Sequence, residues 1–204
     1  MTTTAAVNGA FTYIIAFCIL LFAGILFFTV LLPIRYRRSR NPTPARIDGN
    51  WLAEGAFILA SLLAALTMFL YGYTSFTFLK TAPADAMKVT VVARQWSWLF
   101  QYDNNRKSTS LVVPQGRDVD LVLTSTDVIH GFFVPAYRIK QDAVPGMKTH
   151  IWFKADRPGS VDVLCSQYCG LQHSKMLSKI YVVPPADYEK WYRGEEVEIP
   201  GLTE

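Results

Sequence analysis

The sequence predicts two membrane-spanning helices followed by one small all-β domain. Two runs, Phe11–Ile34 and Gly55–Leu79, contain no charged residue, and each is longer than the ~20 apolar residues that a helix needs to cross a bilayer. After Lys80 the chain changes to short runs rich in β-branched residues, separated by turn signals such as Pro145-Gly146. This pattern is typical of a β-sandwich or barrel. We therefore expect a transmembrane hairpin over residues 1–80 and a β-domain over residues 81–204.

The charges around the two apolar runs predict their orientation. We expect helices at about residues 11–34 and 53–79. They are expected in the membrane, because the rest of the chain is too short to enclose two fully apolar helices in a soluble core. The connecting loop 35–52 contains five arginines and one acidic residue, whereas residues 1–10 carry no charged side chain. The positive-inside rule then places the loop in the cytoplasm. Both termini and the β-domain are expected on the periplasmic side of a bacterial inner membrane.

The net charge of +4 comes entirely from the membrane part of the chain. Residues 1–80 contain six basic and two acidic side chains, which account for the whole excess. The β-domain is therefore formally neutral, so its charge gives no reason to expect nucleic-acid binding. We expect membrane lipid, and no nucleic acid, among its partners.

Seven short runs are interpreted as strands of an antiparallel sandwich. They are Val89–Ala93, Trp96–Tyr102, Ser110–Val113, Val119–Thr124, His150–Lys154, Ser160–Leu164 and Leu177–Val183. A short terminal helix is expected at residues 186–193. Within the second run, the two-residue period of a strand places Trp96, Trp98, Phe100 and Tyr102 on one face. Core packing is the simplest role for most of these rings.

The segment CSQYCGLQHSKM contains Cys165, Cys169, His173 and Met176, all of which are side chains that bind soft metals. A structural zinc site normally uses only cysteine and histidine, and an iron–sulfur cluster needs four cysteines or two with two histidines. Methionine beside cysteine and histidine instead indicates copper electron transfer. A mononuclear copper site needs only one cysteine. The second cysteine in this segment allows a binuclear site, in which two thiolates bridge a pair of copper ions. A disulfide is the alternative in an oxidising compartment, but it closes only a short loop.

A two-copper site needs a second terminal nitrogen besides His173. The chain contains only two other histidines, His130 and His150. His130 follows the strand expected at Val119–Thr124, whose end can meet the loop after Ser160–Leu164. His150 lies inside a strand-like run, where an exposed or edge position is the simpler interpretation. We therefore expect His130 to complete the site.

The segments DVIH, DAVPG and CSQYCGLQHSKM, together with two helices and the aromatic run QWSWLFQY, resemble subunit II of the haem–copper oxidases and its binuclear copper A centre. The resemblance implies a cupredoxin-like Greek-key β-barrel. It implies a ligand set of His130, Cys165, Cys169, His173, Met176 and the backbone carbonyl of Gln167. It also implies that the chain accepts electrons from a cytochrome c-type donor and assembles with subunit I and other oxidase subunits. Haem in subunit I then reduces oxygen to water, coupled to proton pumping.

Some residues in or near the segment Cys165–Met176, called the copper loop below, depart from the family pattern. Gln167 replaces a glutamate that in the family also binds magnesium at the subunit I interface. An amide is a poorer ligand for a hard cation, so we do not carry that magnesium site over to this chain. Thr126, Gln101 and Gln167 are neutral where carboxylates are common for donor steering. We therefore expect donor docking to be less electrostatic than usual, as it would be with a membrane-bound or fused donor cytochrome.

The resemblance also suggests roles for two residues outside the copper loop. Trp96 matches the family's exposed tryptophan where electrons enter. Glu54, in LAEGAF, matches the glutamate at the mouth of a proton pathway into subunit I, although Ser61 replaces the usual proline further along that helix. The simpler interpretation of Glu54 is a charge that reaches the membrane interface.

Two other functions remain open from the sequence. The copper A subunit of a nitric oxide reductase would look the same, because the gas chemistry takes place in subunit I. A membrane-anchored copper carrier belongs to a different class. Carriers usually expose few, labile ligands, whereas five side chains in a closed cage favour electron transfer.

Overall fold

A computed structural model of the chain describes residues 2–43 and 49–202. Arg46 and Asp48 of the predicted cytoplasmic loop lie outside the described residues. The chain divides into two compact units. One unit comprises Asn8–Ser75, and the other comprises Phe76–Glu204 together with Met1–Val7.

The first unit consists of most of two long helices, α1 (Thr3–Arg35) and α2 (Trp51–Lys80). Both are long and apolar enough to cross a membrane, and their most apolar windows are not buried by the protein. Asn50 caps α2, because its Oδ1 accepts hydrogen bonds from the N–H groups of Leu52 and Ala53 at 3.1 and 3.3 Å. The two predicted helices are therefore confirmed; α1 begins eight residues earlier than expected, and the other helix ends differ from the prediction by one or two residues.

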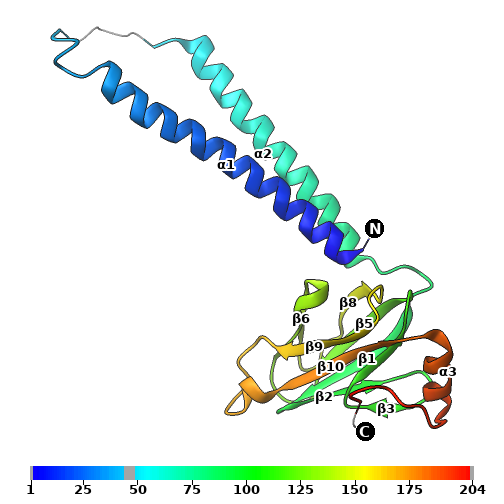
Figure 1. The fold of residues 1–204 in the computed structure, drawn as a ribbon. Helices are drawn as coiled ribbons and strands as arrows, with labels where there is room; N and C mark the ends of the chain where they lie inside the picture. Colours follow the sequence, from blue (N-terminus) through cyan, green and yellow to red (C-terminus); the bar gives the residue numbers. More distant parts are fainter. Residues whose placement is uncertain (1, 44–48, 203–204) are drawn as a thin grey trace. The chain divides into compact units, whose positions relative to one another are not determined.

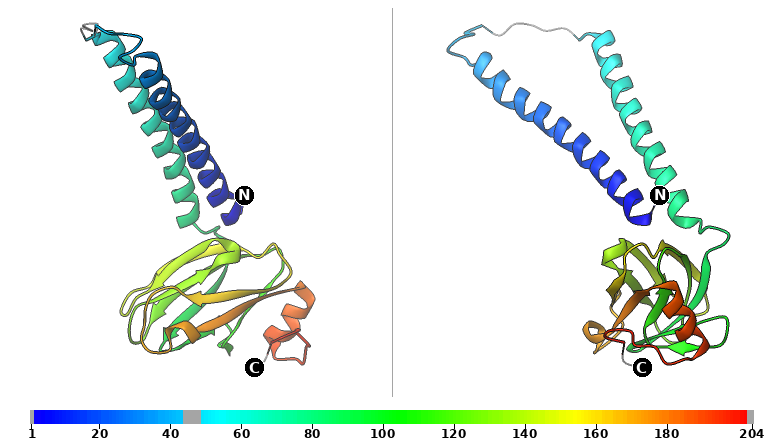
Figure 2. Two further views of the ribbon diagram at one scale, coloured as in Figure 1. Left: turned by 60° about the vertical axis from the view of Figure 1, so that its left-hand side comes forward. Right: turned by 45° about the vertical axis from the view of Figure 1, so that its right-hand side comes forward.

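The second unit is dominated by two five-stranded sheets that form the two layers of a sandwich (Figure 1; Figure 2 shows the layers from two further sides). The strands of the first sheet, in spatial order, are β3 (Lys107–Ser108), β2 (Ser97–Gln101), β1 (Met87–Arg94), β5 (Asp118–Ser125) and β8 (Thr149–Lys154). Those of the second are β4 (Leu111–Pro114), β10 (Leu177–Val183), β9 (Gly159–Cys165), β6 (His130–Val134) and β7 (Ile139–Ala143). A helix, α3 (Pro185–Arg193), follows β10.

The strand pairing is mixed, so the expectation of a purely antiparallel sandwich was wrong. β1 pairs with β5 in parallel, and β10 pairs with β4 in parallel, while the other pairs are antiparallel. Alternation of apolar and polar residues looks the same in both kinds of pair, so it cannot reveal the direction of a neighbouring strand. The parallel pairs arise because the chain crosses between the two sheets before it returns.

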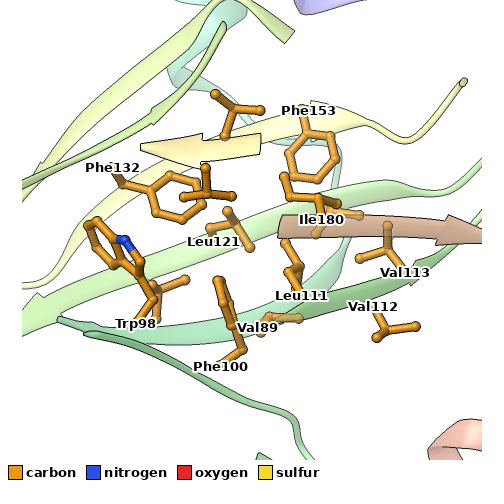
Figure 3. Packing of buried hydrophobic residues seen from close by; sticks show 14 of the residues in the cluster. Val89, Trp98, Phe100, Leu111, Val112, Val113, Leu121, Phe132, Phe153 and Ile180 are labelled. Carbon is orange, nitrogen blue, oxygen red and sulfur yellow. The ribbon is translucent and has the colours of Figure 1, made fainter. Parts of the chain in front are cut away.

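The core lies between the two sheets and contains side chains from both (Figure 3). Trp98 and Phe132, one from each sheet, meet edge to face with ring centroids 5.3 Å apart. At one end of the core, the Tyr102 hydroxyl accepts a hydrogen bond from Val112 N–H at 2.8 Å and donates one to the Val112 carbonyl at 3.0 Å. The Tyr102 ring also packs 5.0 Å from Trp191 of α3. The terminal helix is thereby fixed to the sandwich.

The structure contains three strands that the sequence did not predict and corrects one face assignment. β3, β6 and β7 were not expected. Trp96 was placed in a strand with Trp98 and Phe100, but it lies in the turn between β1 and β2 and is half-buried. Trp98, Phe100 and Tyr102 are buried as expected.

Candidate metal centre

The second sheet brings the predicted ligands to one place. His130 is the first residue of β6, and Cys165 is the last residue of β9. These strands are antiparallel neighbours in which Phe132 pairs with Cys165. The chain then forms a loop with a short 3-10 helix, His173–Lys175, before β10 begins at Leu177. All the soft-metal side chains of the loop therefore return to the end of β6.

The donor atoms of these side chains face one another. Cys169 Sγ lies 3.7 Å from Cys165 Sγ, 3.6 Å from His173 Nδ1 and 3.8 Å from Met176 Sδ. His130 Nδ1 lies 3.1 Å from Met176 Sδ. Ligand atoms of His130, Cys165 and Cys169 all lie within 4.8 Å of one another. A set of two thiols, two imidazole nitrogens and a thioether in this space fits copper better than a hard cation.

The protein shields several of these donor side chains from solvent. His130 and Met176 are fully buried and Cys169 is nearly so. Both loop cysteines are free thiols, and their sulfurs are much further apart than the ~2.05 Å of a disulfide. The Cys165 thiol points to the backbone carbonyl of Gln167 at 3.2 Å. That carbonyl, expected as a ligand from the resemblance, thus lies beside the cluster.

Asp127 fixes the orientation of the His130 ring. Its Oδ1 lies 2.8 Å from His130 Nε2, which leaves Nδ1 facing the sulfurs. The carboxylate also accepts hydrogen bonds from Gln95 N–H at 2.7 Å, Val128 N–H at 2.6 Å and the Ser125 hydroxyl at 3.2 Å. Burial alone would raise the pKa of Asp127, but these hydrogen bonds outweigh burial and lower the pKa to about 2. A carboxylate behind a ligating histidine is a common way to set its tautomer.

The turn between β1 and β2 holds the copper loop through a residue that the sequence did not single out. Gln95 Nε2 donates a hydrogen bond to the Cys169 carbonyl at 2.8 Å, while its backbone N–H binds Asp127. One residue thus connects the loop with the carboxylate behind His130. Only the tertiary structure brings this turn to the loop, so no local sequence pattern identifies Gln95.

Two glycines allow the segments around the site to approach closely. A Cβ atom on Gly131 would lie 3.0 Å from the backbone nitrogen of Gln167. A Cβ atom on Gly170 would lie 3.2 Å from Cζ2 of Trp96, and Gly170 also has a φ of +119°. Each glycine directly follows a predicted ligand, His130 or Cys169. Larger residues there would push the loop away from β6 or from Trp96.

Without a metal the Cys169 thiol holds its proton at neutral pH. Burial, together with the neighbouring Cys165 thiol, raises the pKa of Cys169 to about 11. A metal that binds through thiolate must therefore displace this proton.

The remaining predicted residues lie elsewhere or have a different setting. His150 is exposed on the edge strand β8, 3.6 Å from Asp120, as expected for a histidine outside the site. Glu54 lies in the first turn of α2 and is exposed. Gln167 Nε2 lies 3.3 Å from both carboxylate oxygens of Asp142. The Gln167 amide thus donates to the Asp142 carboxylate. Magnesium prefers carboxylate ligands, and Gln167 does not add a second carboxylate beside Asp142.

Comparison with known proteins was consistent with this site. Residues 104–183 match the family model described as cytochrome c oxidase subunit II, periplasmic domain. The matched region contains every predicted copper ligand from His130 to Met176. Trp96 and Glu54 lie outside it.

Individual relatives extend the similarity beyond that region. The chain is 31% identical over 184 residues to the alternative cytochrome c oxidase subunit 2 of Bradyrhizobium diazoefficiens, covering 74% of this chain and 64% of the relative. It is 42% identical over 111 residues to cytochrome c oxidase subunit 2 of Thermostichus vulcanus, covering 54% of this chain and 34% of the relative. The chain thus spans between one third and two thirds of the length of these relatives.

A solved structure shares the fold of the β-domain. The periplasmic domain of subunit II of the cytochrome oxidase of Bradyrhizobium japonicum superposes with a TM-score of 0.53 at 29% identity, covering 56% of this chain and 96% of that domain. With the two apolar helices, this similarity identifies a membrane protein with a cupredoxin-like periplasmic domain. Over residues 104–183 the chain thus matches the cytochrome c oxidase subunit II family, and its longer alignments are to members of that family.

Proposed function

We propose that this chain is the subunit through which electrons enter a respiratory haem–copper oxidase, and that it holds a binuclear copper centre. The observation that carries the proposal is the convergence of two thiols, two imidazole nitrogens, one thioether and one backbone carbonyl at the end of β6 and β9. When bound, the two copper ions supply a one-electron carrier whose charge change is shared between them.

The residues of the chain have distinct roles in holding such a pair. Cys165 and Cys169 would hold both ions through their thiolates, and His130 and His173 would each provide one imidazole nitrogen. Met176 Sδ and the Gln167 carbonyl would be weaker ligands. Because His130 and Met176 are fully buried, the protein limits the movement of these ligands when the charge of the centre changes.

Trp96 is positioned to connect the centre with a donor. Its ring carbons and nitrogen lie over Gly170, the residue after ligand Cys169. The ring is half-buried, so one part faces solvent. A large conjugated surface of this kind suits a brief docking encounter with a cytochrome c-type donor.

The whole complex is proposed on the basis of the family. Its relatives are named as cytochrome c oxidase subunits, so we propose subunit I and other oxidase subunits as partners. Electrons would pass to haem in subunit I, which reduces oxygen to water coupled to proton pumping. Both termini and the β-domain would lie in the periplasm, with the arginine loop in the cytoplasm. Glu54, at the cytoplasmic start of α2, would then lie at the mouth of a proton pathway.

The geometry of the site disfavours a copper carrier. A carrier has to release its metal to a partner, which requires accessible ligands. Here His130 and Met176 have no exposed surface and Cys169 is 4% exposed. The names of the relatives favour oxygen over nitric oxide as the final acceptor.

Electron paramagnetic resonance of the copper-loaded full chain tests the proposal. We expect seven hyperfine lines, because one electron couples equally to two copper nuclei. His130→Gln should lose this pattern. His150→Gln is the matched control, because His150 is exposed on β8, and it should leave the spectrum unchanged. A four-line spectrum in the unmodified chain would indicate a single copper ion and refute the binuclear assignment.

A further inference from the structure

A small pocket outside the metal centre combines an apolar floor with a basic rim. It lies between the C-terminal end of α2 and strands β7 and β8, all within the same compact unit. Phe76, Leu79 and Ile151 provide the apolar lining, and Lys80, Arg138 and Lys140 provide the charges. Its volume is about 150 Å³. The proposed electron-transfer function does not use this pocket.

Specific contacts hold the walls of the pocket together. Trp152 of β8 donates a hydrogen bond from its indole N–H to the Phe78 carbonyl at 3.1 Å, and the two rings pack edge to face at 5.1 Å. Lys80 Nζ donates a hydrogen bond to Gln141 Oε1 of β7 at 3.0 Å. The end of α2 is thereby attached to both strands, so the pocket is formed before any ligand binds.

The basic rim is not neutralised by the protein. Across residues 2–43 and 49–202, Lys80, Arg138 and Lys140 form no ion pair. The nearby acids have other partners: Asp120 faces His150 at 3.6 Å, and Asp142 accepts from the Gln167 amide. Three cations without an ion-pair partner around one small pocket favour an anionic ligand.

The pocket lies where a membrane span meets the aqueous phase. Lys80 is the first charged residue after the uncharged run Gly55–Leu79. That run is roughly 37 Å long at ~1.5 Å per helical residue, somewhat more than the ~30 Å hydrocarbon core of a bilayer. If α2 crosses the membrane, its end at Lys80 reaches the level of the lipid headgroups. Trp152 lines the same pocket, and tryptophan is enriched at that level.

The size of the pocket limits which part of a ligand enters it. Sites that enclose a whole small molecule usually measure ~300–1,000 Å³, so 150 Å³ admits only a headgroup. Arginine is well suited to bind phosphate through two parallel hydrogen bonds, and lysine adds a point charge. The apolar lining suits the glycerol carbons that follow the phosphate. We propose that this pocket binds the phosphate headgroup of an anionic phospholipid whose acyl chains remain in the bilayer.

Native mass spectrometry of the full chain, released from detergent micelles, tests this proposal. Dioleoyl phosphatidylglycerol is titrated against dioleoyl phosphatidylcholine, with inorganic phosphate as a separate arm. We expect one phosphatidylglycerol per chain in preference to phosphatidylcholine. Arg138→Gln combined with Lys140→Gln should weaken phosphatidylglycerol binding by about 30-fold, because two basic contacts are lost.

Matched variants separate a built site from general attraction to positive charge. Lys107→Gln combined with Arg157→Gln removes one lysine and one arginine that are exposed and lie outside the pocket, and binding should be unchanged. Arg138→Lys combined with Lys140→Arg keeps the charge and should retain most of the affinity, which distinguishes loss of contacts from misfolding.

Several results would overturn the proposal. Equal losses in the pocket variant and in the control variant would show diffuse electrostatics. Phosphatidylcholine binding as tightly as phosphatidylglycerol, or inorganic phosphate competing at equal concentration, would exclude an anionic-lipid site. If the isolated chain binds the lipid but the assembled oxidase retains none, the pocket belongs to a protein interface instead.

Discussion

Replacement of Asp127 should destabilise the metal-free β-domain measurably, because this carboxylate holds the His130 ring and the neighbouring turn in place. Its oxygens accept hydrogen bonds from Gln95 N–H, Val128 N–H and Ser125, and one oxygen contacts His130 Nε2. Asp127→Asn preserves the shape of the side chain but removes its charge. It also gives the side chain two donors where the protein presents donors of its own. We therefore expect a loss of stability without a change of fold.

The pKa of Asp127 sets the magnitude. These contacts lower the pKa from 3.8 to about 2, which corresponds to about 2 kcal/mol of preference for the charged form. The side chain is 29% exposed, so solvent screening reduces this value only in part. A carboxyl group whose pKa is lower in the folded state stabilises the protein fully above pH ~4, and this contribution is lost as the pH falls toward 2. At pH 3 about 1 kcal/mol should remain.

Thermal unfolding of the metal-free chain, followed by near-ultraviolet circular dichroism of the β-domain, measures the effect. Asp127→Asn should lower Tm by roughly 5–10 °C at pH 7, with about half that difference at pH 3. Asp162→Asn is the control, because Asp162 is 70% exposed and its ion pair with Lys179 is long, at 3.9 Å. The Tm of this variant should not change measurably. Equal shifts in both variants, or a difference that does not narrow at pH 3, would refute the role assigned to Asp127.

Four further predictions concern separate parts of the chain. Tyr102→Phe should cost about 1–3 kcal/mol in urea unfolding, because it leaves the buried N–H and carbonyl of Val112 without their partner; an unchanged midpoint would contradict this. Trp96→Phe should slow reduction by the donor in stopped-flow measurements at least several-fold while the copper spectrum stays the same, and unaltered kinetics would remove Trp96 from the electron path. Glu54→Gln should slow oxidase turnover without altering copper spectra; normal turnover would leave Glu54 as an interface charge. Turnover with the native donor should depend only weakly on ionic strength, and a steep decline with added salt would contradict the weakly charged docking surface.

The sequence predicted the helices and most of the sandwich, but not the pairing of the strands. A charge-free run longer than 20 residues has few alternatives in a chain of this size, so α1 and α2 were predictable. Strands rich in valine and isoleucine were also visible. β6 was hidden because it begins with His130 and Gly131 and is followed directly by Pro135, and β7 was hidden because IKQDA alternates poorly. The parallel pairs depend on which sheet each strand joins, and that choice is made by packing across the whole domain.

The candidate site was predictable where its chemistry is local. Four of the proposed side-chain ligands lie in one twelve-residue segment, and His130 was predicted from the need for a second nitrogen. The residues that position them were harder to find. Asp127 precedes His130 by three residues, and this spacing in the DVIH segment was the available signal that the carboxylate contacts the His130 ring. Gln95 had no such signal, because the turn between β1 and β2 meets the copper loop only after both sheets have formed.

The placement of Asp127 also changes the expected character of the donor surface. With Thr126, Gln101 and Gln167 neutral, Asp127 is the carboxylate of the DVIH segment that could attract a basic donor. In the structure its oxygens contact His130 Nε2 and accept hydrogen bonds from the Ser125 hydroxyl and two backbone N–H groups. Around the same loop, Tyr168 is 81% and Leu171 is 90% exposed. Because Asp127 is the one carboxylate of the DVIH segment, and exposed apolar side chains gain from burial at any salt concentration, we expect the donor to be held mainly by apolar contact. A donor tethered to the membrane would need little long-range steering, since its local concentration is already high.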